Sequence, residues 1–135
     1  MMAGEELTRI DLKQFENQAY MNLETYRKNG EGVKTPVWFV LDGSTFYVRT
    51  GKDSWKVKRL RSNPHASIVP SNSSGKPLGD WATATAELVE GEALERQVNE
   101  MFNRKYGIQK RFFDLMGRVR GNELATLAIS AAGND

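Results

Sequence analysis

The 135-residue chain has no cysteine and a single histidine. Without cysteine there can be no disulfide bond, no thiolate nucleophile and no zinc–thiolate site. A lone histidine, His65, cannot form a histidine-rich metal cluster, and we expect no Ser-His-Asp triad around it. We therefore predict neither a metal site nor a catalytic side chain, and any reactive group would come from outside the chain.

Long apolar runs and a strong net charge are missing as well. No run reaches the 18 or so apolar residues of a membrane helix, and Met1–Arg9 has no hydrophobic signal core. The net charge of +2 is small for a protein that coats nucleic acid. We expect a cytoplasmic protein with neither a membrane nor a nucleic-acid partner, folded as one domain over residues 1–135.

Strand patterns dominate the chain, and helical patterns flank them. A hairpin turn is expected at Asp42-Gly43, and residues 71–80 have the composition of a mobile loop. The segments predicted as strands are Tyr20–Tyr26, Val33–Leu41, Thr45–Thr50, His65–Pro70, Trp81–Glu90 and Glu123–Ser130. The segments predicted as helices are Thr8–Ala19, Ser54–Ser62, Glu92–Tyr106 and Ile108–Arg118. This order favours a mainly β, α+β class and a small antiparallel barrel.

Positive charge is concentrated in one short segment. Six basic residues and one acidic residue lie between Arg49 and Arg61, so the rest of the chain is net acidic. Ser54 is a good N-cap for the helix that follows, and a helix N-terminus readily receives phosphate. Hydroxyls of Thr50 and Ser54, with the ammonium groups of Lys52 and Lys56, would complete a phosphate site.

Two other interpretations of the basic segment stay open. A run of lysine and arginine on a short helix is often only a solvated face. The segment could also contact single-stranded nucleic acid, with Trp38, Trp55 and Trp81 as stacking surfaces.

A proline lies inside the predicted strand with the strongest β signal, Val33–Leu41, in Thr35-Pro36-Val37-Trp38. Proline donates no ladder hydrogen bond, so it belongs at a sheet edge, at a bulge or beside a ligand. This segment is either a plain edge strand or a stretch whose backbone lines a flat ring system, with Trp38 as a wall.

The basic segment also carries a family resemblance. The run Phe46–Pro64 closely resembles the pyridoxamine-phosphate-oxidase-like split-barrel superfamily, and the resemblance extends over about Tyr20–Ile129. Within that superfamily the chain is most similar to the class that uses the deazaflavin coenzyme F-420. The segments that carry this closer similarity are Thr35–Trp38, Ser54–Arg59, Gly75–Gly79 and Lys105–Ile108.

The resemblance implies a six-stranded antiparallel split β-barrel, a homodimer, and a flavin-type cofactor in a groove at the dimer interface. Thr50, Ser54 and Lys56 match the positions that hold the cofactor phosphate, and Trp55 lies among them. The residues that match the ring-facing strand are Thr35, Pro36, Val37 and Trp38. Charge alone adds Lys52 and Lys58 as cofactor-binding candidates.

The chain departs from the pyridoxamine phosphate oxidases in the strand before the hairpin. Their phosphate-binding arginine and lysine are replaced by Pro36–Leu41, and their C-terminal substrate motif is missing. We therefore expect an oxidoreductase other than pyridoxamine phosphate oxidase, which moves a hydride between F-420 and a small organic substrate. FMN is the alternative cofactor, although an acidic polyglutamate tail on F-420 would suit Lys58, Arg59 and Arg61. A non-catalytic flavin carrier or sensor and a small nucleic-acid-binding domain are the alternative functions.

Overall fold

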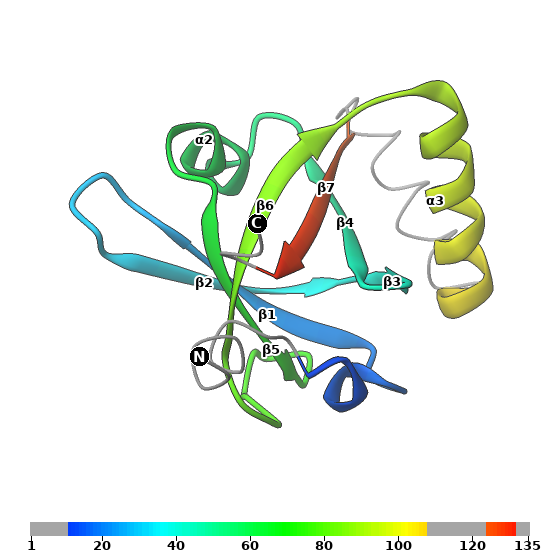
Figure 1. The fold of residues 1–135 in the computed structure, drawn as a ribbon, viewed down its shortest axis with the longest axis horizontal. Coiled ribbons are helices and arrows are strands. Elements are labelled where there is room, and N and C mark those ends of the chain that lie inside the picture. Colours follow the sequence, from blue (N-terminus) through cyan, green and yellow to red (C-terminus); the bar gives the residue numbers. More distant parts are fainter. Residues whose placement is uncertain (1–10, 108–123, 132–135) are drawn as a thin grey trace, which may run out of the picture.

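The computed structural model describes residues 11–107 and 124–131. Seven antiparallel strands form one curved sheet in the order β2-β1-β5-β6-β7-β4-β3 (Figure 1). The strands are β1 Tyr20–Tyr26, β2 Gly32–Trp38, β3 Val40–Asp42, β4 Thr45–Gly51, β5 His65–Ser71, β6 Ala82–Val89 and β7 Leu124–Ala131. The helices are a 3-10 turn η1 Leu12–Phe15, then α2 Trp55–Ser62 and α3 Glu92–Tyr106.

The strand count corrects the six-stranded expectation. The predicted strand Val33–Leu41 is interrupted at Phe39, and its two parts lie at opposite ends of the sheet order as β2 and β3. One continuous stretch of chain therefore supplies both edges of the sheet. Phe39 is the point where the chain crosses from one edge to the other, and this crossing gives the sheet its barrel shape.

The break at Phe39 is stabilised by the C-terminal end of α3. The backbone N–H of Phe39 donates to the Tyr106 hydroxyl over 3.0 Å, and the Phe39 carbonyl accepts from the Lys105 ammonium over 2.8 Å. The Tyr106 hydroxyl also lies 2.8 Å from the carbonyls of Phe39 and Ala19, and its single proton serves one of them at a time. Side chains of α3 thus make hydrogen bonds to the backbone of Phe39 in place of those that a neighbouring strand would make.

Burial changes the ionisation of both side chains. It raises the pKa of the Tyr106 phenol above its ordinary value of 10.0, so the hydroxyl stays protonated and able to donate. Burial also lowers the pKa of Lys105 to about 8, although the ammonium lies 2.8 Å from the Phe39 carbonyl and 3.6 Å from the Phe39 ring centroid, contacts that favour the charged form. Lys105 as a whole residue is nevertheless exposed.

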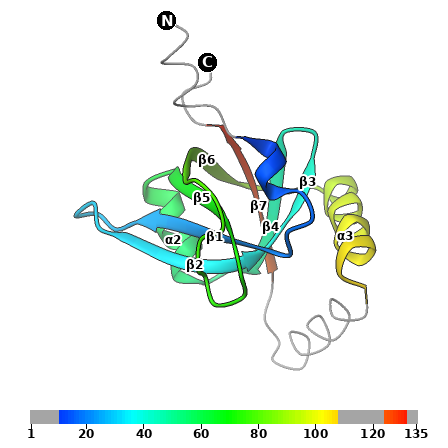
Figure 2. The same cartoon turned by 90° about the horizontal axis from the view of Figure 1, so that it is seen from below.

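The core has two parts. The larger one fills the barrel and includes Met21, Leu23, Phe46 and Ile68, each fully buried. The smaller one lies under α3, where Trp38 stacks face to face on Tyr106 with ring centroids 4.2 Å apart. Helices α2 and α3 lie on opposite sides of the barrel in both views (Figures 1 and 2). Helix α3 therefore braces the crossing, while α2 is left beside the β1–β2 hairpin.

The predicted helix Thr8–Ala19 is only a 3-10 turn within the described residues. Asp11 caps its start by accepting from the Lys13 N–H. Asn17 has a left-handed φ of 61°, which ends helical geometry before β1 begins. The predicted helix Ile108–Arg118 lies outside the described residues.

Residues 71–80 are predicted as a mobile loop, but Ser71 is the last residue of β5 and the others are tied to the body by specific hydrogen bonds. The Leu78 N–H donates to the Pro70 carbonyl over 2.7 Å, and the Asn22 side-chain amide donates to the Gly75 carbonyl over 2.7 Å. Gln14 and Asp80 exchange two further hydrogen bonds of 2.9 Å. The composition indicated a loop correctly, but it did not show these side-chain partners. No helix in the part of the chain that the structure describes is both long and apolar enough to cross a bilayer.

Candidate functional site

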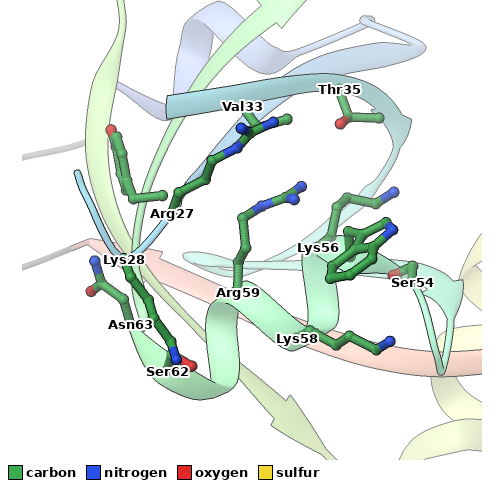
Figure 3. A pocket seen from close by; sticks show the side chains of 12 residues that line it. Arg27, Lys28, Val33, Thr35, Ser54, Lys56, Lys58, Arg59, Ser62 and Asn63 are labelled. Carbon is green, nitrogen blue, oxygen red and sulfur yellow. The ribbon is translucent and has the colours of Figure 1, made fainter. Parts of the chain in front are cut away.

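A groove of about 1240 Å³ runs between the β1–β2 hairpin and α2 (Figure 3). One wall comes from the hairpin and the other from α2 with the residues at its two ends. The hairpin supplies Tyr26, Arg27, Lys28, Val33 and Thr35. The helix side supplies Ser54, Trp55, Lys56, Lys58, Arg59, Ser62 and Asn63.

Local sequence explains how α2 presents its charged face. Ser54 has an extended backbone, and its hydroxyl accepts from the Val57 N–H over 3.4 Å, which caps the helix. Val57 and Leu60 are the buried residues of α2 and attach it to the body. Lys56 and Arg59, each next to one of these anchors, line the groove.

The groove is strongly cationic. Arg27, Lys28, Lys56, Lys58 and Arg59 line it, and no carboxylate is among its lining residues. Burial, with a smaller contribution from the charge of Arg59, lowers the pKa of Lys56. A cation placed among other cations and partly removed from water is stabilised by binding an anion, which offsets both costs.

The guanidinium of Arg59 is held by a hydrogen bond to β1. Its Nε donates to the Thr25 hydroxyl over 2.7 Å, and Thr25 is fully buried in β1. Burial and then the charge of Arg27 lower the Arg59 pKa, so the two guanidinium groups interact across the groove. Figure 3 shows both side chains reaching into the space between β2 and α2.

Trp55 provides an aromatic surface at the start of α2. It is 70% exposed, the largest exposure among the large hydrophobic side chains that the structure describes. The Lys58 ammonium lies 4.5 Å from the centroid of its ring, in cation–π geometry. Lys58 is therefore partly engaged by Trp55, and both residues are exposed.

Half of the predicted cofactor-binding residues line this groove. Those that line it are Thr35, Ser54, Trp55, Lys56 and Lys58. Thr50 lies near the end of β4 and Lys52 in the turn before α2, so both adjoin the helix start without lining the groove.

The rest of the predicted ring-facing strand lies beyond the groove. Pro36 faces Asn22 across the β1–β2 ladder, Val37 packs against the main core, and Trp38 stacks on Tyr106. β2 is the edge strand that the proline indicated, with ladder partners on the β1 side only.

The sequence did not indicate that the hairpin turn contributes to the groove, and it placed Arg49 among the basic residues of the candidate site although Arg49 lies elsewhere. Arg27 and Lys28 lie between the predicted strands Tyr20–Tyr26 and Val33–Leu41 and had no predicted role, yet the hairpin places them opposite α2. Arg49 belongs to the basic segment by sequence, but it faces α3 and pairs with Glu95 at 3.5 Å. The strand alternation around Arg49 was the signal that could have separated it from the groove.

Comparison with protein families decides the relationship. The model of the pyridoxamine 5'-phosphate oxidase family matches residues 10–127, most of the chain. The chain belongs to the pyridoxamine 5'-phosphate oxidase family. A search of curated protein sequences gives no significant match. The family assignment confirms the resemblance inferred from the basic segment.

Solved structures of the same fold have diverse named roles. The heme storage protein HutZ from Vibrio cholerae has a TM-score of 0.69 and 17% identity, covering 93% of this chain and 92% of that one. A FAD-binding protein from Mesorhizobium loti has a TM-score of 0.62 and 13% identity, covering 90% and 84%. An F-420 reductase has a TM-score of 0.54 and 13% identity, covering 90% and 92%. At these identities the similarity shows a shared fold alone.

The groove has the chemistry of an anion site and lacks that of a metal site. Within residues 11–107 and 124–131, no group of three or more His, Asp or Glu side chains could hold a metal ion. The hydroxyls of Thr35 and Ser54, the N-terminus of α2 and the lining cations suit a phosphate or carboxylate ligand. The exposed face of Trp55 could contact a planar ring system.

Proposed function

We propose that the protein is an oxidoreductase that binds F-420 in the groove, with the cofactor phosphate at the N-terminus of α2. The observation that carries the proposal is the donor set, which combines a capped helix start with five cations and no carboxylate. The family membership and the F-420 reductase with the same fold support a flavin-type cofactor.

The residues present fit a phosphate. Ser54 and Lys56 lie at the start of α2, where the helix dipole favours negative charge. No acidic residue occupies the first turn of α2 to compete with the ligand. Three or four charge-assisted hydrogen bonds of about 1.5–3 kcal/mol each are of the size needed for a micromolar complex, about 8 kcal/mol.

The role of the chain's own residues would be to bind the cofactor, to orient it and to shield it from water. The cofactor, when bound, supplies the hydride chemistry, so no catalytic side chain is required. Thr35, on the edge strand opposite α2, is the polar group of β2 that faces the groove. We assign it to positioning, together with the backbone of the segment up to Trp38.

Fluorescence titration of the purified protein with F-420 and with FMN tests the cofactor. We expect tighter binding of F-420, because Arg27 and Arg59 provide cationic surface beyond what one phosphate uses. Tight binding of FMN with none of F-420 would reverse this order and leave an FMN-dependent enzyme.

The Lys56→Ala variant tests the phosphate position. We expect it to weaken cofactor binding by about 1.5–3 kcal/mol, the value of one charge-assisted bond. Arg61→Ala is the matched control, because Arg61 is a cation of the same helix that lies outside the groove lining. Equal affinities of Lys56→Ala and the unsubstituted protein would place the phosphate elsewhere.

A cofactor carrier without turnover is the second candidate. No histidine or carboxylate lines the groove, and the named role of HutZ is storage. Bound cofactor with no turnover over a broad panel of electron acceptors would favour the carrier. Reduction of any one acceptor in excess over the protein would favour the enzyme.

We also propose a homodimer, following the family resemblance. Sedimentation at assay concentration measures it directly, and a monomer with full cofactor affinity would refute the idea that a second copy completes the groove.

A further inference from the structure

Five cationic side chains line the groove, more than one phosphate needs for neutralisation, and two of them, Arg27 and Arg59, lie away from the start of α2. Ser54 and Lys56 lie at the first turn of α2, whereas Arg59 lies further along the same helix. Three residues of helix correspond to a rise of roughly 4.5 Å between Lys56 and Arg59. Arg27 approaches from the opposite wall.

The fold holds the side chain of Arg59 and the backbone of Arg27. Arg59 is fixed through Nε by the buried Thr25 hydroxyl, which leaves its terminal N–H groups for another partner. Arg27 begins a tight turn in which its N–H donates to the Glu31 carbonyl and its carbonyl accepts from Gly30, both over 2.8 Å. The backbone of Gly30 has a φ of +91°, which glycine tolerates best.

The two guanidinium groups repel each other, and of the two only Arg27 has a carboxylate partner among the described residues. The nearest carboxylate to Arg27 is Glu31, at 3.3 Å, with both side chains more than half exposed. Arg59 has no ion pair among the described residues. An anionic group between Arg27 and Arg59 would remove the repulsion and accept forked hydrogen bonds from both.

We propose that Arg27 and Arg59 form a second anion-binding position, which takes a further carboxylate or phosphate group of the ligand whose first phosphate binds at α2. This inference rests on the proposed function for the first phosphate. The second group is either a carboxylate of an acidic tail or a second phosphate, and the ligand spans the groove from the start of α2 to the hairpin.

The test compares four probes at one low salt concentration: FMN, FAD, F-420 with a defined glutamate tail, and tetraglutamate peptide. The variants are Arg27→Gln and Arg59→Gln, with Arg61→Gln as the matched control on α2. We expect each groove variant to weaken F-420 roughly 10-fold. FMN should change less than about 2-fold, and Arg61→Gln should leave both ligands unaffected.

The probes separate the two sources of the second anion. Competition by tetraglutamate that is lost in Arg27→Gln supports a carboxylate, and a matching loss of FAD affinity supports a phosphate. An equal loss for FMN and F-420 would overturn the proposal, because both arginines would then serve the first phosphate. Unchanged F-420 affinity in Arg27→Gln would overturn it as well.

Failure of the proposed function gives a different pattern. If no flavin or deazaflavin binds, the cofactor proposal fails, while tetraglutamate binding that depends on Arg27 still supports the second position. Absence of binding by every anion would overturn both. Arg59→Gln removes the hydrogen bond to the buried Thr25 and therefore affects the body of the protein. If that variant fails to fold, the result for Arg27→Gln, at an exposed turn, tests the proposal by itself.

Discussion

Replacing Tyr106 by phenylalanine removes one oxygen from the point where the sheet edges meet. The ring stack on Trp38, with centroids 4.2 Å apart and planes 8° apart, can be kept by phenylalanine. The hydroxyl accepts from the Phe39 N–H over 3.0 Å, and Phe39 is only 1% exposed. The variant therefore leaves a buried N–H without a partner.

The expected loss follows from the number of bonds. An unpaired buried donor costs about 1–3 kcal/mol, and the hydroxyl also donates one bond to the carbonyl of Phe39 or Ala19. The Lys105 ammonium remains on the Phe39 carbonyl and offsets part of that second loss. We expect Tyr106→Phe to lower the free energy of unfolding by about 2 kcal/mol.

Urea denaturation followed by tryptophan fluorescence measures this change, with the slope m as a check that the unfolded state is unaltered. Tyr20→Phe is the matched control. The Tyr20 ring also contacts Trp38, at 6.4 Å, but its hydroxyl makes no hydrogen bond among the described residues. A loss below about 0.5 kcal/mol for Tyr106→Phe, or an equal loss for both variants, would refute the role of the hydroxyl at the crossing.

Three further predictions concern other contacts. The pKa of Lys105 is lowered to about 8, so the charged side chain lowers the free energy of unfolding below that pH, and this loss is relieved as the pH rises toward 10.5. Urea denaturation at about pH 7.5 and pH 10 should therefore show a rise in the free energy of unfolding that Lys105→Met abolishes. An unchanged pH profile in Lys105→Met would contradict this. A double-mutant cycle with Arg49→Met and Glu95→Gln should give a coupling of about 0.5–1 kcal/mol, because the pair is only partly buried, and zero coupling would make the contact incidental. Gly79→Ala should destabilise by about 1–3 kcal/mol in thermal unfolding, because the added carbon would lie 3.0 Å from the Pro70 ring; wild-type stability would show that the loop shifts freely.

Local patterns in the sequence predicted most elements of the sheet. Tyr20–Tyr26 coincides with β1, and the helix Glu92–Tyr106 coincides with α3. The Ser54 N-cap was predicted from the residue type alone, and the structure has it. These features depend on neighbours within a few residues, which is the range over which periodicity and capping rules operate.

The break at Phe39 could not be predicted in this way. Val33–Leu41 is strand-like apart from Pro36, and Pro36 lies inside β2, so it does not indicate the break at Phe39. The hydrogen bonds that make the break possible come from Lys105 and Tyr106, more than 60 positions away. A tertiary contact overrode a local propensity, because strand preference reports how side chains fit a pleated surface and carries no information on a distant hydrogen-bond partner.

The candidate site shows the same division between local and distant information. The helix half was visible in the sequence, because Ser54, Lys56 and Lys58 lie within five residues. The hairpin half was not, because Arg27 becomes opposite to Arg59 only when β1 pairs with β2 and α2 packs against β1.

The crossing at Phe39 links the two sides of the molecule. β2 supplies Val33 and Thr35 to the groove wall and ends at Trp38, which is stacked on Tyr106. The same tyrosine fixes the next residue, so α3 determines where β2 ends, although α3 lies on the opposite side of the barrel from α2 (Figure 2). A change at the C-terminal end of α3 would therefore reach the groove through the backbone of β2, without contact with the ligand. Cofactor affinity in Tyr106→Phe, measured under conditions where the variant is fully folded, reports whether that backbone is rigid enough to transmit the change.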